Sequence, residues 1–214
     1  MKTILAEIKT SLLLTLVFAM LLCGAYPLAV WAGAHLLFPE KADGSLVLDK
    51  TGAARGSSLL AQNFSSEKYF WPRPSAAGNG WDAANSSGTN LGSTSAKLAT
   101  GVHAKDGDGK DVNDPGNFDG IKDLVAAYRA AHGLAATDSV PADAVTRSGS
   151  GLDPEISVAN ALLQMGRVAR ARHLSPDKLQ ALVAAHTAGR DLGVFGEPRV
   201  NVLQLNLALE AAAP

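Results

Sequence analysis

Residues 11–30 read SLLLTLVFAMLLCGAYPLAV, and this stretch decides the fold class of the chain. No Lys, Arg, Asp or Glu occurs from Thr10 to Pro39. Because an α-helix rises about 1.5 Å per residue, about 20 apolar residues cross the roughly 30 Å hydrocarbon layer of a bilayer. The sequence therefore predicts one transmembrane helix, with aromatic side chains at its far interface and a kink or an end at Pro27.

A cleaved signal peptide is the competing interpretation of this run. Signal peptides have an apolar stretch of about 7 to 15 residues, which is shorter than this one, although residues 32–34 (AGA) resemble a cleavage site. Lys2 and Lys9 precede the run, so the positive-inside rule favours a cytoplasmic N-terminus. We therefore expect a cytoplasmic segment 1–10, a transmembrane helix with an interface segment 11–38, and an extracytoplasmic domain 39–214.

Composition argues against nucleic-acid binding and against a disulfide in the outer domain. The chain has 214 residues, enough for one medium-sized domain besides the membrane helix, and its formal net charge is -1. A nucleic-acid-binding protein would need a basic surface, and the sequence has no block of like charges. The lone cysteine, Cys23, lies inside the apolar run, so the outer domain cannot form an internal disulfide.

The outer domain mixes strands and helices. Residues 45–48 (SLVL) predict a short strand, and residues 63–95 predict a long loop whose aromatic side chains either anchor it or meet a partner. Capping residues and apolar periodicity predict three helices: Gly120–His132, Ser157–His173, and one that begins after Ser175 and ends near Gly189. The predicted fold class is α/β in the α+β sense: a single N-terminal transmembrane helix and one mixed domain.

Two helical segments need closer description. In the second predicted helix, Leu162 and Val168 belong to an apolar face that we expect to be buried, and Arg167 lies off that face with the neighbouring arginines. The last segment alternates like a strand, but Asn201 and Gln204 form a capping pair. We expect a helix after Val200.

Residues 104–120 (AKDGDGKDVNDPGNFDG) superficially resemble a calcium loop, because Asp106 and Asp108 have the alternate spacing of carboxylate ligands. The pattern then fails, since Lys110 occupies a ligand position and Asn117 replaces the bidentate glutamate. We expect a solvated, flexible insertion over residues 101–118 and no metal site.

Motifs of catalysis are also missing from the sequence. There is no GxxxxGK[ST] loop for phosphates, and the DKTG at Asp49–Gly52 lacks the following threonine of the phosphorylated loop of P-type pumps. The SGSG at Ser148–Gly151 does not have the GxSxG spacing of a nucleophile elbow. The histidines are scattered without metal-ligand spacing. We expect no catalytic residue and no covalently bound cofactor.

Two polar features suggest docking or structural roles. Arg73 lies between Pro72 and Pro74, so its guanidinium is presented at a restricted position, either to a partner or simply on an exposed turn. The turn Ser148, Gly149, Ser150, Gly151, which precedes Leu152 and Asp153, either binds an anion through its amides or only introduces the next helix.

Six segments carry a resemblance to a known family. They are GSSLLAQNF (56–64), YFWPRPSA (69–76), NSSGTNLG (85–92), VTRSGSGLDPEIS (145–157), ALLQMGRVARAR (161–172) and GRDLGVFGEPRVNVLQLNLALE (189–210). In this order they resemble the KdpC family, the C subunits of the Kdp potassium-transporting P-type ATPases. The YPL at Tyr26–Leu28 also fits, whereas the acidic stretch 101–118 is longer than is usual in that family.

The resemblance implies a non-catalytic accessory subunit in the bacterial inner membrane. Its partners would be the channel-like KdpA, the ATP-hydrolysing KdpB and the small KdpF, and it would act as a catalytic chaperone that raises the ATP affinity of KdpB. ATP would be associated with the complex, and Gln164 matches a glutamine linked in the family to nucleotide contact. The alternative is a membrane-anchored extracytoplasmic binding protein or hydrolase that acts alone.

Overall fold

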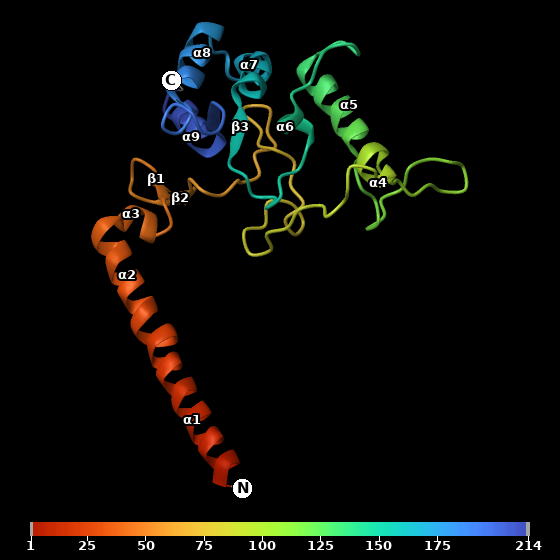
Figure 1. Ribbon diagram of the computed structural model, residues 1–214. Helices are drawn as coiled ribbons and strands as arrows, with labels where there is room; N and C mark the ends of the chain where they lie inside the picture. Colours follow the sequence, from red (N-terminus) through yellow and green to blue (C-terminus); the bar gives the residue numbers. More distant parts are fainter. Residues whose placement is uncertain (1, 213–214) are drawn as a thin grey trace. The chain divides into compact units, whose positions relative to one another are not determined.

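The computed structural model describes residues 2–212 (Figure 1). It divides into two compact units, Met1–Leu46 and Val47–Pro214, and each is described by itself. Helices and strands are both present, and the one helix near the N-terminus is long and apolar enough to cross a membrane. The predicted fold class is therefore confirmed.

The first unit contains a helix of 35 residues that runs from Thr3 to Leu37. At about 1.5 Å per residue it is about 50 Å long, which exceeds the roughly 30 Å hydrocarbon layer. It consists of α1 (Lys2–Ala19), the π-helical turn η1 (Met20–Ala25) and α2 (Tyr26–Leu37), and the short α3 (Pro39–Ala42) follows.

The helix does not end at Pro27, although its hydrogen-bond pattern changes just before that residue. The amide of Tyr26 donates to the carbonyl of Leu21, five residues back, as in a π-helix. Pro27 then lies in the first turn of α2, where its missing N–H costs least. The π-helical turn therefore accommodates the proline within a continuous helix.

The second unit combines short strands with helices. Its elements, the first of which begins at the last residue of the first unit, are β1 (Leu46–Leu48), β2 (Ala54–Ser57), α4 (Ala96–Thr100), α5 (Ile121–His132), α6 (Ala142–Val145), β3 (Glu155–Ser157), α7 (Val158–Arg172), α8 (Pro176–Ala185), β4 (Thr187–Ala188), β5 (Arg199–Asn201) and α9 (Val202–Ala212). β1 pairs with β2, and the larger sheet has the order β3-β5-β4.

The three-stranded sheet brings the C-terminal helices together. β5 is the central strand and pairs antiparallel with β3, where Ile156 faces Val200, and with β4, where Thr187 faces Val200. α7 begins directly after β3, and α9 begins directly after β5. The sheet therefore fixes the starts of α7 and α9, whose side chains build the site described below.

Local capping explains where the helices begin. The Ser157 hydroxyl accepts from the amide of Asn160 (3.1 Å) at the start of α7, and Ser175 accepts from Lys178 (3.4 Å) at the start of α8. Gly133, with φ of 68°, ends α5. These boundaries agree with the predicted helices, except that α8 ends at Ala185, because Thr187–Ala188 pair with β5 instead.

The ambiguous C-terminal segment contains both predicted structures in succession. Arg199–Asn201 form β5, and the Asn201 carboxamide then accepts from the amide of Gln204 (3.1 Å) as α9 begins. The predicted helix after Val200 is confirmed.

The core consists of two neighbouring clusters of buried side chains. The larger cluster joins Phe70 of the long loop to the three-stranded sheet and to α7, α8 and α9. Its members are Phe70, Ile156, Ala161, Val168, Leu179, Val183, Val200, Val202, Leu205 and Leu209. The smaller lies between α5 and α6 and is formed by Tyr128, Ala144 and Val145.

Two residues of α7 were assigned incorrectly from the sequence, whereas Val168 is buried as expected. Leu162 is 44 % exposed, whereas Arg167 is only 3 % exposed. Arg167 can be buried because the backbone carbonyls of Glu67 and Tyr69 accept its hydrogen bonds. An apolar period cannot show such partners, which lie about a hundred positions away in the sequence.

Most of the acidic stretch is exposed. Residues 105–116 are all exposed, whereas residues 101, 103, 104, 117 and 118 are half-buried. Asp106 accepts from the amides of Asp108 (3.0 Å) and Lys110 (2.9 Å), so its carboxylate closes a local turn. The flexibility of this stretch stays a prediction.

Candidate functional site

The candidate site is built on an irregular loop. Residues 58–95, all within the described part of the chain, form neither helix nor strand. Asn206 of α9 accepts from the amide of Phe70 (2.8 Å) and donates to its carbonyl (2.9 Å). Gln164 of α7 does the same for Trp71, with distances of 2.6 Å and 3.1 Å. Two side-chain amides therefore take the place of a neighbouring strand for this segment.

Gln164 uses its full hydrogen-bonding capacity inside the chain. Besides its two bonds to Trp71, its oxygen accepts from Arg167 Nη2 (2.8 Å), and its nitrogen donates to Asn160 Oδ1 (3.0 Å). A glutamine side chain has two donors and two acceptor lone pairs. In this conformation, a ligand can bond to Gln164 only by displacing one of these partners.

Gln164 belongs to a row of polar side chains whose hydrogen bonds all run in one direction, from Arg167 to Asp143. Arg167 donates to Gln164, Gln164 donates to Asn160, and Asn160 Nδ2 donates to Asp143 Oδ2 (2.9 Å). Asp143 also accepts from the Ser157 hydroxyl (2.8 Å). A cation stands at one end of the row and a carboxylate at the other, so the amide dipoles between them are aligned favourably.

Arg167 is a buried cation that carbonyls and an aromatic ring surround. Its Nη1 donates to the carbonyls of Glu67 (2.6 Å) and Tyr69 (2.9 Å), and its guanidinium lies 3.9 Å from the centre of the Trp71 ring. Among the described residues, no carboxylate forms an ion pair with it. Burial lowers the pKa of Arg167 to about 10, so it remains charged at neutral pH.

His132 and Tyr128 cover the other side of this arginine. Their rings stack with centroids 4.0 Å apart. His132 Nε2 accepts from Arg167 Nε (3.2 Å), and because arginine can only donate, the proton of the neutral ring must be on Nδ1, which donates to the Tyr128 carbonyl (2.8 Å). Burial lowers the pKa of His132 and raises that of Tyr128.

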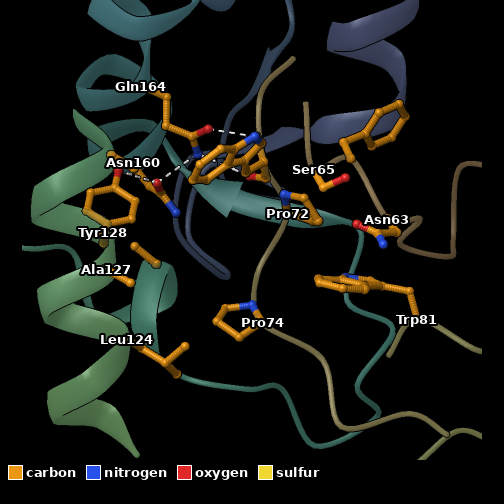
Figure 2. Close-up of a pocket in the computed structure, with 14 residues that line it drawn as sticks. Asn63, Ser65, Pro72, Pro74, Trp81, Leu124, Ala127, Tyr128, Asn160 and Gln164 are labelled. Carbon is orange, nitrogen blue, oxygen red and sulfur yellow. Dashed lines mark hydrogen bonds between the residues drawn. The ribbon is translucent and has the colours of Figure 1, made fainter. Parts of the chain in front are cut away.

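A pocket of about 340 Å³ opens above this row (Figure 2). Figure 2 shows Leu124, Ala127 and Tyr128 of α5 on one side, the loop with Pro72, Pro74 and Trp81 on the other, and Asn160 and Gln164 at one end. The complete lining is Asn63, Phe64, Ser65, Trp71, Pro72, Pro74, Trp81, Leu124, Ala127, Tyr128, Ala131, Ala144, Asn160 and Gln164.

The pocket is suited to binding an apolar group. Its volume falls within the range of about 300 to 1,000 Å³ that is typical of ligand pockets. Among these described lining residues, none carries a carboxylate, imidazole, amine or thiol. The lining offers aromatic and aliphatic surface, whereas the side-chain amide of Gln164 is already bonded within the chain.

The residues selected from the sequence as docking candidates lie around this loop. Arg73 Nη1 donates to Asp153 Oδ2 (2.7 Å), and Nη2 donates to the Thr146 carbonyl (3.2 Å), so the guanidinium is bonded within the chain. Pro74 lines the pocket. The structure thus joins Arg73 and Asp153, whose relation was not visible in the sequence, and a role for either in docking stays a prediction.

The turn Ser148–Gly151 holds the far end of the loop. The Ser75 hydroxyl donates to the Gly151 carbonyl (2.6 Å), and the amide of Ser87 donates to the Ser150 carbonyl (3.0 Å). Gly151 has φ of 69°, and a Cβ there would lie 2.4 Å from the Ser87 carbonyl oxygen. The Gly151 amide is already bonded to the Ser148 carbonyl (3.2 Å). Anion binding by this turn stays a prediction.

One group of possible metal ligands was not visible in the sequence. His103, Asp119 and Asp123 each place a ligand atom within 4.8 Å of the others. Asp123 already accepts from His103 Nε2 (3.0 Å) and from the amide of Gly120 (2.9 Å), so it caps α5. The hydrogen bond to Asp123 raises the pKa of His103, and that to His103 lowers the pKa of Asp123. These contacts explain the group as a helix cap.

Sequence reasoning missed most of the row beneath the pocket. Asn160, Gln164 and Arg167 are spaced so that they share one face of α7, and this spacing was the available signal. Asn206, which brackets Phe70, lies between apolar residues of α9 and gave no comparable signal.

Comparison with known proteins settles the family. The family model described as "KdpC: K+-transporting ATPase, c chain" matches residues 8–211. The chain belongs to the KdpC family. The KdpC resemblance found in the six segments is thereby confirmed, and the chain is a subunit of a potassium-transporting ATPase.

Curated relatives agree over nearly the whole chain. The potassium-transporting ATPase KdpC subunit of Rhodospirillum rubrum is 46 % identical over 210 residues, 98 % of this chain and 98 % of the relative. That of Kineococcus radiotolerans is 46 % identical over 211 residues, covering 99 % and 96 %. That of Mycobacterium tuberculosis is 45 % identical over 204 residues, covering 95 % and 97 %. Assembly with other Kdp subunits is implied, and the apolar N-terminal helix fits a single-pass membrane protein.

Proposed function

We propose that this chain is the non-catalytic accessory subunit of an ATP-driven potassium-uptake pump, in which it assembles with KdpA, KdpB and KdpF and raises the ATP affinity of KdpB. The observation that carries the proposal is the KdpC match over residues 8–211. The pocket supports a binding role, because its described lining offers apolar surface and few free polar groups.

The proposed orientation places the N-terminus in the cytoplasm and the second unit outside the inner membrane. Lys2 and Lys9 before the apolar run support it through the positive-inside rule. An outer domain cannot touch cytoplasmic ATP. Its effect on ATP affinity must then pass through partner subunits as a coupling free energy, which requires that it bind one state of the pump more tightly than another.

A direct nucleotide contact at Gln164 is a separate part of the proposal. It requires Gln164 to exchange a bond to Trp71 or Asn160 for one to the nucleotide. The two routes differ in what they predict, because a direct contact gives ATP binding to the isolated chain and the indirect route does not. Radiolabelled ATP and the purified full chain in detergent distinguish them. Gln180→Ala, an exposed glutamine on α8, is the control for Gln164→Ala.

The decisive experiment isolates the complex through a tag on this chain. We expect a P-type ATPase and a channel-like subunit to be recovered with it, together with potassium-stimulated ATP hydrolysis. In preparations that lack this chain, the KM for ATP should rise, because the coupling is lost. Deletion of residues 1–39 should abolish co-purification. Recovery of the chain alone would contradict the proposal and favour an anchored protein that acts by itself.

A further inference from the structure

A second surface feature is the hairpin of residues 190–197, none of which lines the pocket. The backbones of Asp191 and Phe195 exchange two hydrogen bonds, of 2.8 Å and 2.9 Å. Leu192 (φ 53°) and Gly193 (φ 75°) make the tight turn between them. The hairpin is therefore a defined structure and not an open loop.

The tip of this hairpin is apolar and exposed. Leu192 is 90 % exposed, Val194 is 69 % exposed and Phe195 is 64 % exposed. Single exposed apolar residues are ordinary on protein surfaces. Three of them on one short turn are unusual, because turns are commonly occupied by Gly, Pro, Asn, Asp and Ser. We call these three side chains the apolar tip.

Ion pairs close the base of the hairpin and tie it to the sheet. Arg190 pairs with Glu197 (2.6 Å). Arg199 of β5 pairs with Glu155 of β3 (3.0 Å) and with Asp191 (3.3 Å). The apolar tip is thus held in place before any partner arrives, which reduces the conformational entropy lost on binding.

The charges beside the apolar tip are arranged unevenly. The side chains of Asp191 and Glu197 are 70 % and 77 % exposed, whereas those of Arg190 and Arg199 are 45 % and 30 % exposed. The carboxylates therefore face the surroundings more than the guanidinium groups do. With Glu155, three carboxylates stand beside these two arginines, so the group has a formal charge of -1. Such a negative rim is repelled by anionic lipid and by the same rim on a second copy of this chain, and it is attracted by a basic surface.

We propose that the apolar tip docks into an apolar socket, rimmed by Lys or Arg, on another subunit of the same potassium-transporting ATPase. Exposed apolar side chains on a rigid hairpin are the kind of anchor that carries most of the energy of a protein interface. Because the carboxylates beside the apolar tip are exposed, the rim of the socket on the other subunit is expected to be positively charged. The proposal rests on assembly of the chain with other subunits, but not on any effect on ATP affinity.

Site-specific photo-crosslinking in the assembled complex tests the proposal. A photoreactive phenylalanine analogue replaces Leu192 in the tagged full chain, and a matched control carries it at Leu162, which is 44 % exposed on α7. We expect a covalent adduct to another subunit from position 192 and a much weaker one from position 162. Adducts only to lipid or to a second copy, equal adducts from both positions, or no protein adduct would overturn the proposal.

A binding measurement gives a second, independent test. The triple variant L192S/V194S/F195S is compared with Leu162→Ser for the amount of other subunits recovered through the tag. Truncation of an interface anchor weakens binding by about tenfold or more, so recovery should fall for the tip variant alone. Unchanged recovery overturns the proposal. The thermal unfolding midpoint of each variant must match that of the parent chain, so that the loss reports docking.

The same preparations separate this inference from the proposed effect on ATP affinity. The KM for ATP is measured on the complexes that still assemble with the tip variant. Lower recovery with an unchanged KM supports docking through the apolar tip, whereas full recovery with a changed KM supports only the effect on ATP affinity and overturns the docking proposal.

Discussion

The loop of residues 58–95 and the acidic stretch of residues 101–118 are both irregular, yet they are held in different ways. Phe70 and Trp71 in the first are bonded to Asn206 and Gln164, which lie 136 and 93 positions away along the chain. In the second, Asp106 bonds to amides two and four positions away, and the backbones of Val102 and Phe118, 16 positions apart, bond to each other. The partners of the first segment therefore lie much farther along the chain than those of the second, although both segments lack regular secondary structure over most of their length.

The largest expected effect breaks the distant attachment of the loop. Asn206→Ala leaves the amide and the carbonyl of Phe70 buried without partners, and each such group costs about 1 to 3 kcal/mol. We expect a loss of about 3 kcal/mol in the free energy of unfolding, measured by urea denaturation of the full chain in detergent. Gln204→Ala, an exposed position on the same helix, is the control. Equal losses of unfolding free energy for the two variants would contradict the inference that Asn206 holds the loop in place.

The next effect comes from the turn at the far end of the loop. Gly151→Ala forces a non-glycine residue to adopt φ of 69° and places its Cβ 2.4 Å from the Ser87 carbonyl. We expect a loss of about 2 kcal/mol, because left-handed backbone strain alone costs about 1 to 2 kcal/mol. The matched control is Gly149→Ala on the same turn, where a Cβ meets nothing within 4 Å. A Gly151→Ala protein as stable as the control would show that the loop does not need this turn.

The two regions should also respond to pH in opposite directions. His132, beneath the loop, has its pKa lowered by burial. The unfolded state therefore takes up a proton that the folded state does not, and stability falls as pH falls below about 6.5. The hydrogen bond to Asp123 raises the pKa of His103, which lies near the start of the acidic stretch. The contribution of His103 to the free energy of unfolding is therefore complete below about pH 6.5. It is lost as the pH rises through the pKa of His103 in the folded chain.

Unfolding midpoints between about pH 5 and about pH 8 separate these contributions. His132→Gln should remove the loss of stability toward acid pH, and His103→Gln should remove the loss toward alkaline pH. The change in slope is the readout, because both substitutions also change absolute stability. A variant with the slope of the parent chain would show that its histidine does not couple to folding.

The smallest effect belongs to the acidic stretch itself. Asp106→Ala removes a carboxylate that bonds only to exposed amides in its own turn. Surface substitutions of this kind change the free energy of unfolding by about 0.5 kcal/mol or less. Urea denaturation beside the Asn206→Ala protein measures the contrast. A loss comparable to that of Asn206→Ala would mean that this stretch is held as firmly as the loop.

Local signals were sufficient for much of the fold. The apolar run, the capping serines Ser157 and Ser175, and the capping pair at Asn201 all act within a few residues, so the sequence predicts the elements that they begin. The end of α8 was misplaced, because pairing of Thr187–Ala188 with β5 is a tertiary effect.

The candidate site was much less predictable. Gln164 was selected through family resemblance, but its bonds to Trp71 cross 93 positions. The burial of Arg167 depends on loop carbonyls about a hundred positions away, and arginines are ordinarily placed at the surface. The grouping of Arg73 with Asp153 likewise follows from the fold of the loop and not from spacing along the chain.

The attachment of Phe70 to Asn206 has a consequence for biosynthesis. Chains grow at about 5 to 20 residues per second, so the 136 positions between the two residues take about 7 to 27 seconds to synthesise. During that interval the aromatic segment has left the ribosome while the helix that will hold it does not yet exist. The final residues of the chain therefore complete a segment made early, and a nascent chain that stops before Asn206 leaves an aromatic stretch exposed to aggregation and proteolysis.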